Sequence, residues 1–160
     1  MNQNNITTGW MTWEQIEPYK EQLVDMELKL MIDYHYPDWN IPRSYPESRV
    51  NGLKEHLADG DTFFWGAWSG CELLGYSWDY VAPFIDKKRW IRRSVYFRED
   101  SQSKGLGTKS LLAAIAKAKE IGCDEMSTEY VPQNEKMANL LKKNGFEVSR
   151  IEVVKKLELL

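Results

Sequence analysis

The chain has 160 residues, of which 42% are hydrophobic and 28% charged, and its formal net charge is −3. This length suits a single domain, residues 1–160, that buries a core without a metal or a disulfide. Lys and Arg are dispersed, which argues against nucleic acid as a partner. We see no signal segment and no apolar run long enough for a membrane span, so we expect a cytoplasmic protein without a membrane partner.

The N-terminal part is expected to form one strand and two helices. Residues 1–5 are polar and should be disordered. A short strand is predicted for residues 6–11, followed by a helix that Thr12 can cap and whose apolar residues recur at spacings of three and four from Ile16 to Leu30. A proline-punctuated aromatic loop follows at residues 33–46, and a second helix at residues 47–58 ends at Asp59-Gly60.

The remainder predicts a sheet with two further helices. Strands are expected at residues 62–68 and 72–81, joined by a hairpin, and at residues 90–97, antiparallel to the strand before it. A strand at residues 124–131 should run parallel to 90–97, because a helix ending at Gly122 crosses between them. A helix from Asn134 to Gly145 and a final, bulged strand at residues 146–159 complete the chain. The fold class is therefore α+β, with a mixed, mostly antiparallel sheet flanked by about four helices.

The cysteines and a small arginine cluster have ordinary structural explanations. Cys71 and Cys123 lack the spacing of metal ligands, so we expect reduced thiols and no metal site. Arg89, Arg92 and Arg93 are better explained as a solvated strand edge than as a clamp for a ligand.

A glycine-containing turn precedes the crossover helix. Gly105 and Gly107 allow a sharp backbone turn, so that amides of the loop and of the first helical turn converge on one point, which suits an anion such as a diphosphate. The dinucleotide-binding pattern G-x-G-x-x-G would need glycine where Ser110 stands. The P-loop would need lysine directly after Gly107, where Thr108 stands. Both of these patterns are therefore excluded.

The residues Gln102-x-x-Gly105-x-Gly107 satisfy the pattern [Q/R]-x-x-G-x-[G/A] and resemble the pyrophosphate loop of the GNAT superfamily of N-acetyltransferases. A second segment resembles the pattern N-x-x-A-x-x-L-Y-x-K-x-G-F of the same superfamily. Met137 replaces its alanine and Leu141 its tyrosine, and the positions in register are Asn134, Leu140, Lys143, Gly145 and Phe146. The resemblance covers residues 61–146 well and the N-terminal third in outline.

The resemblance implies a GNAT-like fold in which the central parallel strands splay apart and admit acetyl-CoA as the cofactor. Its pantetheine arm would pair with the backbone of Val95, Tyr96 and Phe97, and a backbone N–H of this strand would stabilise the oxyanion. Asn134 would cap its helix and could also bind the cofactor. The residues around the diphosphate would be Gln102, Ser103, Lys104, Gly105, Leu106, Gly107 and Thr108.

The implied reaction is direct acetyl transfer to a primary amine in a ternary complex. Glu129 is the candidate base, with an ordinary solvated carboxylate as the alternative, and Asp79, Glu99 and His35 are lesser candidates. Leu141 leaves the role of the acid vacant, and Tyr130 or Tyr96 could fill it, although strand packing also explains both. The pocket for the amine could be walled by aromatic residues, or these could plug the core edge: Tyr34, Tyr36, Trp39, Trp78 and Tyr80.

The acceptor is expected to be a small-molecule amine, with a protein N-terminus or lysine as the alternative. A non-catalytic acyl-CoA-binding module is a rival that Leu141 motivates, and a longer acyl donor is a weaker one. A homodimer is expected because such pairs are common, although no residue identifies an interface.

Overall fold

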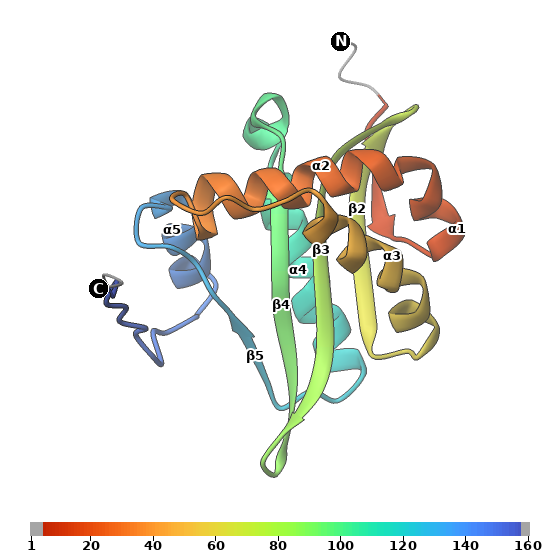
Figure 1. The fold of residues 1–160 in the computed structure, drawn as a ribbon. Helices are drawn as coiled ribbons and strands as arrows, with labels where there is room; N and C mark the ends of the chain where they lie inside the picture. The colour runs from red at the N-terminus through yellow and green to blue at the C-terminus, as the bar shows by residue number, and fades with distance from the viewer. Residues whose placement is uncertain (1–4, 158–160) are drawn as a thin grey trace. The chain divides into compact units, whose positions relative to one another are not determined.

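The computed structural model describes residues 5–157 (Figure 1). Its contacts divide the chain into two compact units, the first ending at Glu129 and the second beginning at Tyr130. We describe each unit by itself. The first contains a five-stranded sheet in the order β1-β2-β3-β4-β5.

The sheet is mixed and mostly antiparallel, as predicted. Its first four strands are β1 (Thr7–Trp10), β2 (Thr62–Ser69), β3 (Glu72–Phe84) and β4 (Lys87–Phe97), and each is antiparallel to the next. The fifth, β5 (Glu125–Thr128), is parallel to β4 and shorter than the predicted segment 124–131. The parallel pair lies at an edge of this sheet.

Helices cover both faces of the sheet in the first unit. The chain first forms α1 (Trp13–Ile16), a 3-10 turn at Glu17–Tyr19, α2 (Lys20–Leu30) and a π-helical turn at Met31–His35, and later α3 (Ser44–Ala58) and α4 (Leu106–Glu120). Figure 1 shows α2 and α3 in front of the strands and α4 behind them. The predicted single helix around 16–30 is interrupted by the 3-10 turn that contains Pro18. Proline has no backbone N–H, so it cannot donate the hydrogen bond that a continuous α-helix would need at this position.

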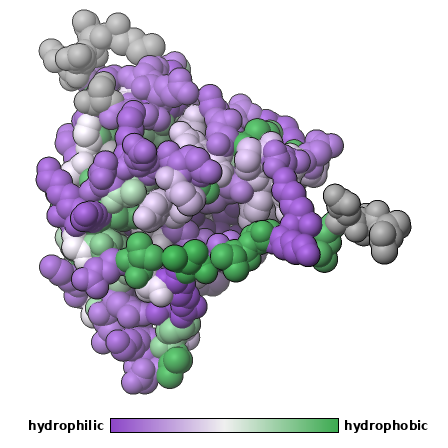
Figure 2. All heavy atoms as spheres, turned by 90° about the vertical axis from the view of Figure 1, so that its left-hand side faces the viewer, coloured by the Kyte–Doolittle hydropathy of each residue, from purple (hydrophilic) through white to green (hydrophobic). Residues whose placement is uncertain are grey.

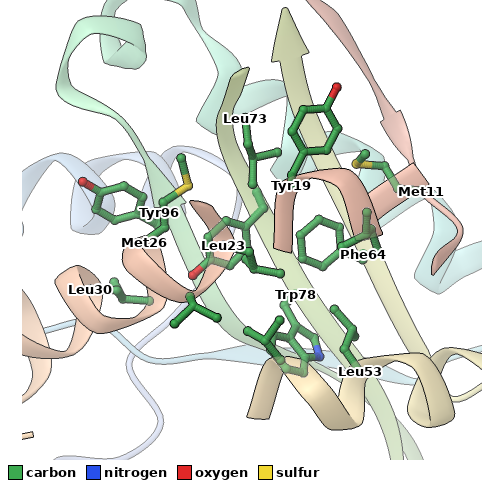
Figure 3. Packing of buried hydrophobic residues seen from close by; sticks show 14 residues of the cluster. Met11, Tyr19, Leu23, Met26, Leu30, Leu53, Phe64, Leu73, Trp78 and Tyr96 are labelled. Carbon is green, nitrogen blue, oxygen red and sulfur yellow. The ribbon is translucent and has the colours of Figure 1, made fainter. Parts of the chain in front are cut away.

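The main core lies between the sheet and the helices α2 and α3 (Figure 3). Leu23, Leu53 and Phe64 are 0%, 0% and 1% exposed, and they come from α2, α3 and β2 respectively. On the other face, Trp90 of β4 packs with Ala114 and Ala118 of α4. The apolar spacing read from the sequence therefore identified the buried sides of α2 and α3. On α4 it was wrong for Leu112, which was expected to be buried and is 51% exposed.

A β-bulge divides β4 into two parts that present opposite faces. Trp78 pairs with Ser94 while the next residue of β3, Asp79, pairs with Arg92, so Arg93 has no partner in the ladder. Before the bulge, Arg92 points to α4 and donates to the hydroxyl of Ser110 at 2.9 Å. Beyond it, Ser94 accepts from a residue of α3, and Tyr96 joins the core under α2. One extra residue thus inverts the alternation of side chains.

The second unit contains α5 (Glu135–Lys143). Asn134 caps this helix as predicted, because its side-chain oxygen accepts from the backbone N–H of Met137 at 3.1 Å. Gly145, with φ of +83°, takes the left-handed conformation beyond the helix end.

The final strand predicted at 146–159 is wrong for residues 146–157, which have no regular secondary structure, and residues 158–159 lie outside the described part. Alternation alone does not make a strand, because a strand also needs a partner for its backbone. Figure 2 shows apolar side chains of this segment at the surface. They are Val148, Ile151, Val153, Val154 and Leu157.

Across residues 5–157, no helix is both long and apolar enough to cross a membrane. The same part of the chain holds no group of three or more His, Cys, Asp or Glu arranged to bind a metal ion.

Candidate active site

The glycine turn leads from a 3-10 helix at Glu99–Lys104 into α4. Gly105 has φ of +69° and ψ of +16°, a left-handed conformation that glycine adopts without strain. The N–H of Lys109 donates to the carbonyl of Gly105 at 3.0 Å, so the amides of Leu106, Gly107 and Thr108 precede the hydrogen-bond ladder of the helix. A Cβ added to Gly105 would meet no atom within 4 Å, so the space beside this residue is open.

The side chains of the turn have different surroundings. Leu106 is 2% exposed and packs with Trp65 and Leu74, so its amide is the part that can face a ligand. Gln102 is exposed and donates from Nε2 to the carbonyl of Phe97 at 3.2 Å, which ties the turn to the end of β4. Lys104 is half-buried and Thr108 exposed. Ser103 lies within the 3-10 helix.

The end of β4 is open on the side of β5. The last pair between these strands is Arg92 with Thr128, where β5 ends, whereas β4 continues to Phe97. The N–H of Arg98 donates to the carbonyl of Leu74 at 2.9 Å. Because backbone groups alternate in direction along a strand, Tyr96 also turns its N–H and C=O toward β3.

Val95 and Phe97 consequently turn their backbone groups to the open edge. The divergence of the two parallel strands that the family resemblance implies is therefore present. Two of the three residues predicted to offer backbone contacts face this edge, and Tyr96 does not. Its ring lies beside Met26 in the core, with the hydroxyl pointing away from the other labelled side chains (Figure 3). Burial raises the pKa of Tyr96, so its hydroxyl stays protonated at neutral pH.

The predicted base, Glu129, and one candidate for the acid, Tyr130, are both exposed. Glu129 follows β5 directly and is exposed, and Tyr130 is 37% exposed. Leu141 is buried within α5, in the second unit. Asn134 belongs to that unit too, and the hydrogen bond that it accepts from Met137 is the cap of its own helix.

Asp79, a lesser candidate for the base, belongs to a buried cluster facing α4. It is 0% exposed and accepts from Ser77 at 2.6 Å and from the indole N–H of Trp90 at 3.1 Å. Arg92, 5% exposed, lies 3.9 Å from its carboxylate. Burial raises the pKa of Asp79 despite the opposing effect of Arg92. These bonds explain the aspartate as a structural group.

A cavity of about 310 Å³ lies on the opposite face of the sheet, between α3 and β3. Trp78 and Tyr80, two of the residues proposed for an acceptor pocket, line it. Tyr34 instead packs against the core, while Tyr36 and Trp39 are exposed and contact each other with 5.1 Å between ring centroids and their planes tilted by 43°. The remaining lining residues are Arg49, His56, Asp59, Asp61, Thr62, Val81 and Arg93.

A buried carboxylate beneath this cavity was not found from the sequence. Glu27 is 0% exposed, and its Oε1 accepts from the hydroxyl of Tyr76. Its Oε2 lies 3.0 Å from the guanidinium of Arg49 but without the geometry of a hydrogen bond. Burial and the charge of Glu27 raise the pKa of Tyr76 well above its ordinary value, so the hydroxyl remains a donor. The signal was available, because Glu27 lies four residues after Leu23 on the buried stripe of α2.

Arg49 connects this carboxylate to β4. Its guanidinium lies 5.3 Å from the ring centroid of Trp78 and donates to the hydroxyl of Ser94 at 3.4 Å. The three clustered arginines of β4 have different surroundings. Arg89 pairs with Glu125, Arg92 is buried and Arg93 is exposed at the bulge. A solvated strand edge was therefore the wrong explanation for Arg92, whose charge is balanced inside the protein by Asp79.

Parallel strands that separate in front of a glycine turn, on a mixed sheet with helices on both faces, are the arrangement of a GNAT acetyltransferase. The family model described as "Acetyltransferase (GNAT) family" matches residues 25–146. The chain belongs to this family, which confirms the assignment made from its two motifs.

Known proteins similar to the chain fall into two groups. The L-methionine sulfoximine/L-methionine sulfone acetyltransferases of Pseudomonas paraeruginosa and Pseudomonas aeruginosa are 35% identical over 79 residues, which are 49% of this chain and 46% of theirs. The chain thus matches about half the length of these curated relatives.

Two solved structures share the fold over nearly the whole chain. A transcriptional regulator from Bacillus halodurans C-125 has a TM-score of 0.72 at 21% identity and covers 95% of this chain and 99% of its own. The aminoglycoside N-acetyltransferase AAC(6')-Iy in complex with CoA has a TM-score of 0.71 at 12% identity, with 99% of each chain covered. At these identities the likeness concerns the fold alone.

Proposed function

We propose that this protein transfers an acetyl group from acetyl-CoA to the primary amine of a small molecule, by direct attack within a ternary complex. The observation that carries the proposal is the open edge of β4. Val95 and Phe97 turn backbone groups to this edge, where the carbonyl of Phe97 also accepts from Gln102, and the strand then leads into the turn at Gly105. Among the relatives, an acetyltransferase of this fold is known in complex with CoA, which supports the choice of cofactor.

The open edge and the turn fit the two ends of acetyl-CoA. The amides of Leu106, Gly107 and Thr108 would hold its diphosphate, because they lie at the positive end of the α4 dipole and no Cβ stands at Gly105. Val95 and Phe97 would hold the pantetheine amides. Gln102, Ser103, Lys104 and Asn134 remain proposed neighbours of the cofactor. When bound, acetyl-CoA supplies an activated thioester.

The protein's largest task would be to deliver a neutral amine. A lysine-like amine has a pKa of about 10.4, so its neutral form at pH 7 costs about 4.6 kcal/mol. Release of a thiol with a pKa of about 8.5 as thiolate costs only about 2 kcal/mol. A base or a desolvating pocket therefore matters more than an acid, and the leucine at position 141 is compatible with catalysis.

We assign the base to Glu129, which is exposed at the end of β5 and could act through a water molecule. The acid is assigned to Tyr130 or Tyr96, and a backbone N–H of β4 would stabilise the oxyanion.

A small acceptor is supported by the relatives and by the cavity. Proteins similar to this one are named for L-methionine sulfoximine and for aminoglycosides, both small molecules. The cavity of about 310 Å³ has the size of a small-ligand site. A protein N-terminus or lysine is the alternative acceptor. We also propose a cytoplasmic location and a homodimer.

The test is a panel of amines assayed for release of the CoA thiol, with acetyl-CoA affinity measured separately by calorimetry. Acetyl transfer to one or more small amines is expected. Tight acetyl-CoA binding without thiol release for any amine or peptide would instead favour the non-catalytic module. Mass spectrometry of the thioester that co-purifies with the protein distinguishes acetyl from longer acyl donors.

A further inference from the structure

The extra residue of the bulge in β4 is an arginine, Arg93. Arg93 is unpaired in the ladder, exposed, and part of the cavity wall. Neighbouring arginines are occupied, Arg89 by Glu125 and Arg92 by Asp79. Arg93 forms no ion pair with any residue of the described range 5–157. Its charge is therefore available to a molecule in the cavity.

A second guanidinium lies on the same wall. Arg49 bonds to Ser94, the residue directly after Arg93, and it also lines the cavity. Glu27 balances its charge from below, and the ring of Trp78 lies against it. These contacts hold the side chain of Arg49 in place, so little conformational entropy is lost when a ligand binds beside it. The N–H groups of its guanidinium then add to the positive potential around Arg93.

The acidic lining residues lie far from this pair. Asp59 follows the end of α3, ten residues after Arg49, which corresponds to about 15 Å along a helix. Asp61 is next to β2, and its carbonyl accepts from Val81. The cavity is thus basic beside the bulge and acidic at its other end. A polycationic acceptor would place a positive group against the arginines, which is unfavourable.

The bulge is also close to where the reaction would occur. Val95, whose backbone faces the open edge, is two residues beyond Arg93, or about 6–7 Å along a strand. A carboxylate separated from the reacting amine by one or two bonds could therefore reach the guanidinium of Arg93. The planar fork of arginine suits a carboxylate, with which it forms paired hydrogen bonds.

We propose that Arg93 binds the carboxylate of the acceptor, so that the enzyme selects amines carrying a carboxylate close to the amine, as α-amino acids do. This inference rests on the proposed acetyl transfer. It concerns a specificity-determining residue and a substrate class, and the aromatic wall of Trp78 and Tyr80 would contact the acceptor's side chain.

The experiment compares acceptors that differ only in the charged group. L-Methionine sulfone and L-norleucine are each assayed beside their carboxamides and their decarboxylated amines. In the native protein, the two amino acids should have the lowest KM. Arg93→Gln should raise that KM by about tenfold to a hundredfold and leave the KM of the analogues that lack the carboxylate unchanged, whereas Arg93→Lys should give an intermediate value.

The matched control is Arg43→Gln. Arg43 is an exposed arginine paired with Glu21 and Asp25 away from the cavity, and its replacement should change none of these KM values. An unchanged affinity of Arg93→Gln for acetyl-CoA verifies that the variant is folded. Equal losses for amino acids and decarboxylated amines in Arg93→Gln, or no loss for either, would overturn the inference.

Calorimetry with CoA-saturated protein separates this inference from the proposed function. One possible result is that the native protein binds the amino acids, that Arg93→Gln abolishes this binding, and that no acetyl transfer occurs. This result would support the carboxylate site and reject the catalytic function. Acetyl transfer with the same KM for acceptors with and without the carboxylate would support the catalytic function and reject the carboxylate site. Absence of both binding and transfer for all six compounds would overturn the carboxylate site.

Discussion

Glu27 is a charged residue on the buried stripe of α2, where the surrounding positions are apolar. A carboxylate at such a position survives because Tyr76 donates to one oxygen and Arg49 lies beside the other. Removing one partner of a buried charge is costly, since the remaining charge then lacks compensation. The burial of Glu27 therefore depends on Tyr76 and Arg49, which belong to other elements.

Tyr76→Phe should lower the free energy of unfolding by about 1.5–3 kcal/mol, because it removes a hydrogen bond to a buried carboxylate without opening a cavity. Urea denaturation measures the change. The matched control is Tyr45→Phe, which alters a tyrosine that is 53% exposed and should change stability by less than about 0.5 kcal/mol. Equal effects of the two substitutions would show that Glu27 does not need this donor.

Asp79 gives the protein a pH dependence opposite to that of most carboxylates. Burial raises its pKa above the ordinary value of 3.8, so above that pH the folded state keeps a proton that the unfolded state has lost. Its contribution to stability is complete below pH 3.8 and is lost as the pH rises through the raised pKa.

Asp79→Asn removes this contribution. The difference in unfolding free energy, native minus variant, should therefore be largest at pH 3 and should fall as the pH rises toward 7, because other groups titrate alike in both proteins. Chemical denaturation at a series of pH values measures it. A difference that grows with pH would mean that Arg92 lowers the pKa of this carboxylate instead.

At the scale of elements, the pairing of β3 with β4 depends on a glycine. A Cβ on Gly75 would meet the ring of Phe97 and would lie 2.7 Å from the carbonyl oxygen of Tyr96, a backbone atom that cannot move without disturbing the strand. Gly75→Ala should therefore cost about 1–3 kcal/mol in unfolding free energy.

Gly66→Ala is the control, because the added Cβ meets the thioether end of Met11, a flexible side chain that can turn aside. It should cost less than about 1 kcal/mol. Thermal or urea unfolding of the two variants compares them. A larger loss for Gly66→Ala would contradict the close approach of β4 to Gly75.

The turn before α4 allows a similar comparison. Gly105 and Gly122 have φ of +69° and +73°, and a Cβ on either meets no atom within 4 Å. Asparagine tolerates this conformation better than other residues do. Gly105→Asn and Gly122→Asn should therefore lower stability alike, while Gly105→Asn alone should weaken acetyl-CoA binding, by about tenfold or more, because its side chain enters the proposed diphosphate site. Calorimetry measures both affinities.

The sequence predicted those elements whose signal is local. The glycines at 105, 122 and 145 marked turns, and apolar spacing identified the helices, because both depend on a few adjacent residues. The bulge at Arg93 could not be predicted, since it is a property of how two strands pair. The burial of the glutamate at position 27 could have been read from the stripe of α2, but its partners could not, because they are 22 and 49 residues away.

At the scale of the whole molecule, the mixed sheet and the parallel pairing of β4 with β5 were predicted correctly, but this pair was expected at the centre of the sheet and lies at its edge. Of the aromatic residues proposed for the acceptor pocket, Trp78 and Tyr80 line the cavity and those of 33–46 do not, and the acceptor site itself stays a prediction. Local patterns cannot say which distant side chains converge on one cavity. Of the charged residues in the cavity wall, Arg93 was interpreted only as part of a solvated arginine cluster.

The segment 146–157 should be the first part of the chain that a protease reaches, because it is exposed and has no regular structure. Brief trypsin digestion is expected to cut at Arg150, Lys155 or Lys156 before any site between residues 13 and 143, which mass spectrometry of the fragments can show. Protection of these sites that increases with protein concentration would indicate that a second copy covers them. Earlier cleavage in the helices would contradict the expected order.

The inserted residue in β4 also determines which face the side chains beyond it point to. Deleting the codon for Arg93 would rotate everything from Ser94 to Phe97 by half a turn, placing Tyr96 against α4 and leaving the hairpin end as it was. Adding or removing a matched pair of residues at the tip of the β3–β4 hairpin, by contrast, would leave the register of Val95 and Phe97 unchanged. The direction of the backbone groups at the open edge therefore depends on the residue count at the bulge and not on the length of the hairpin.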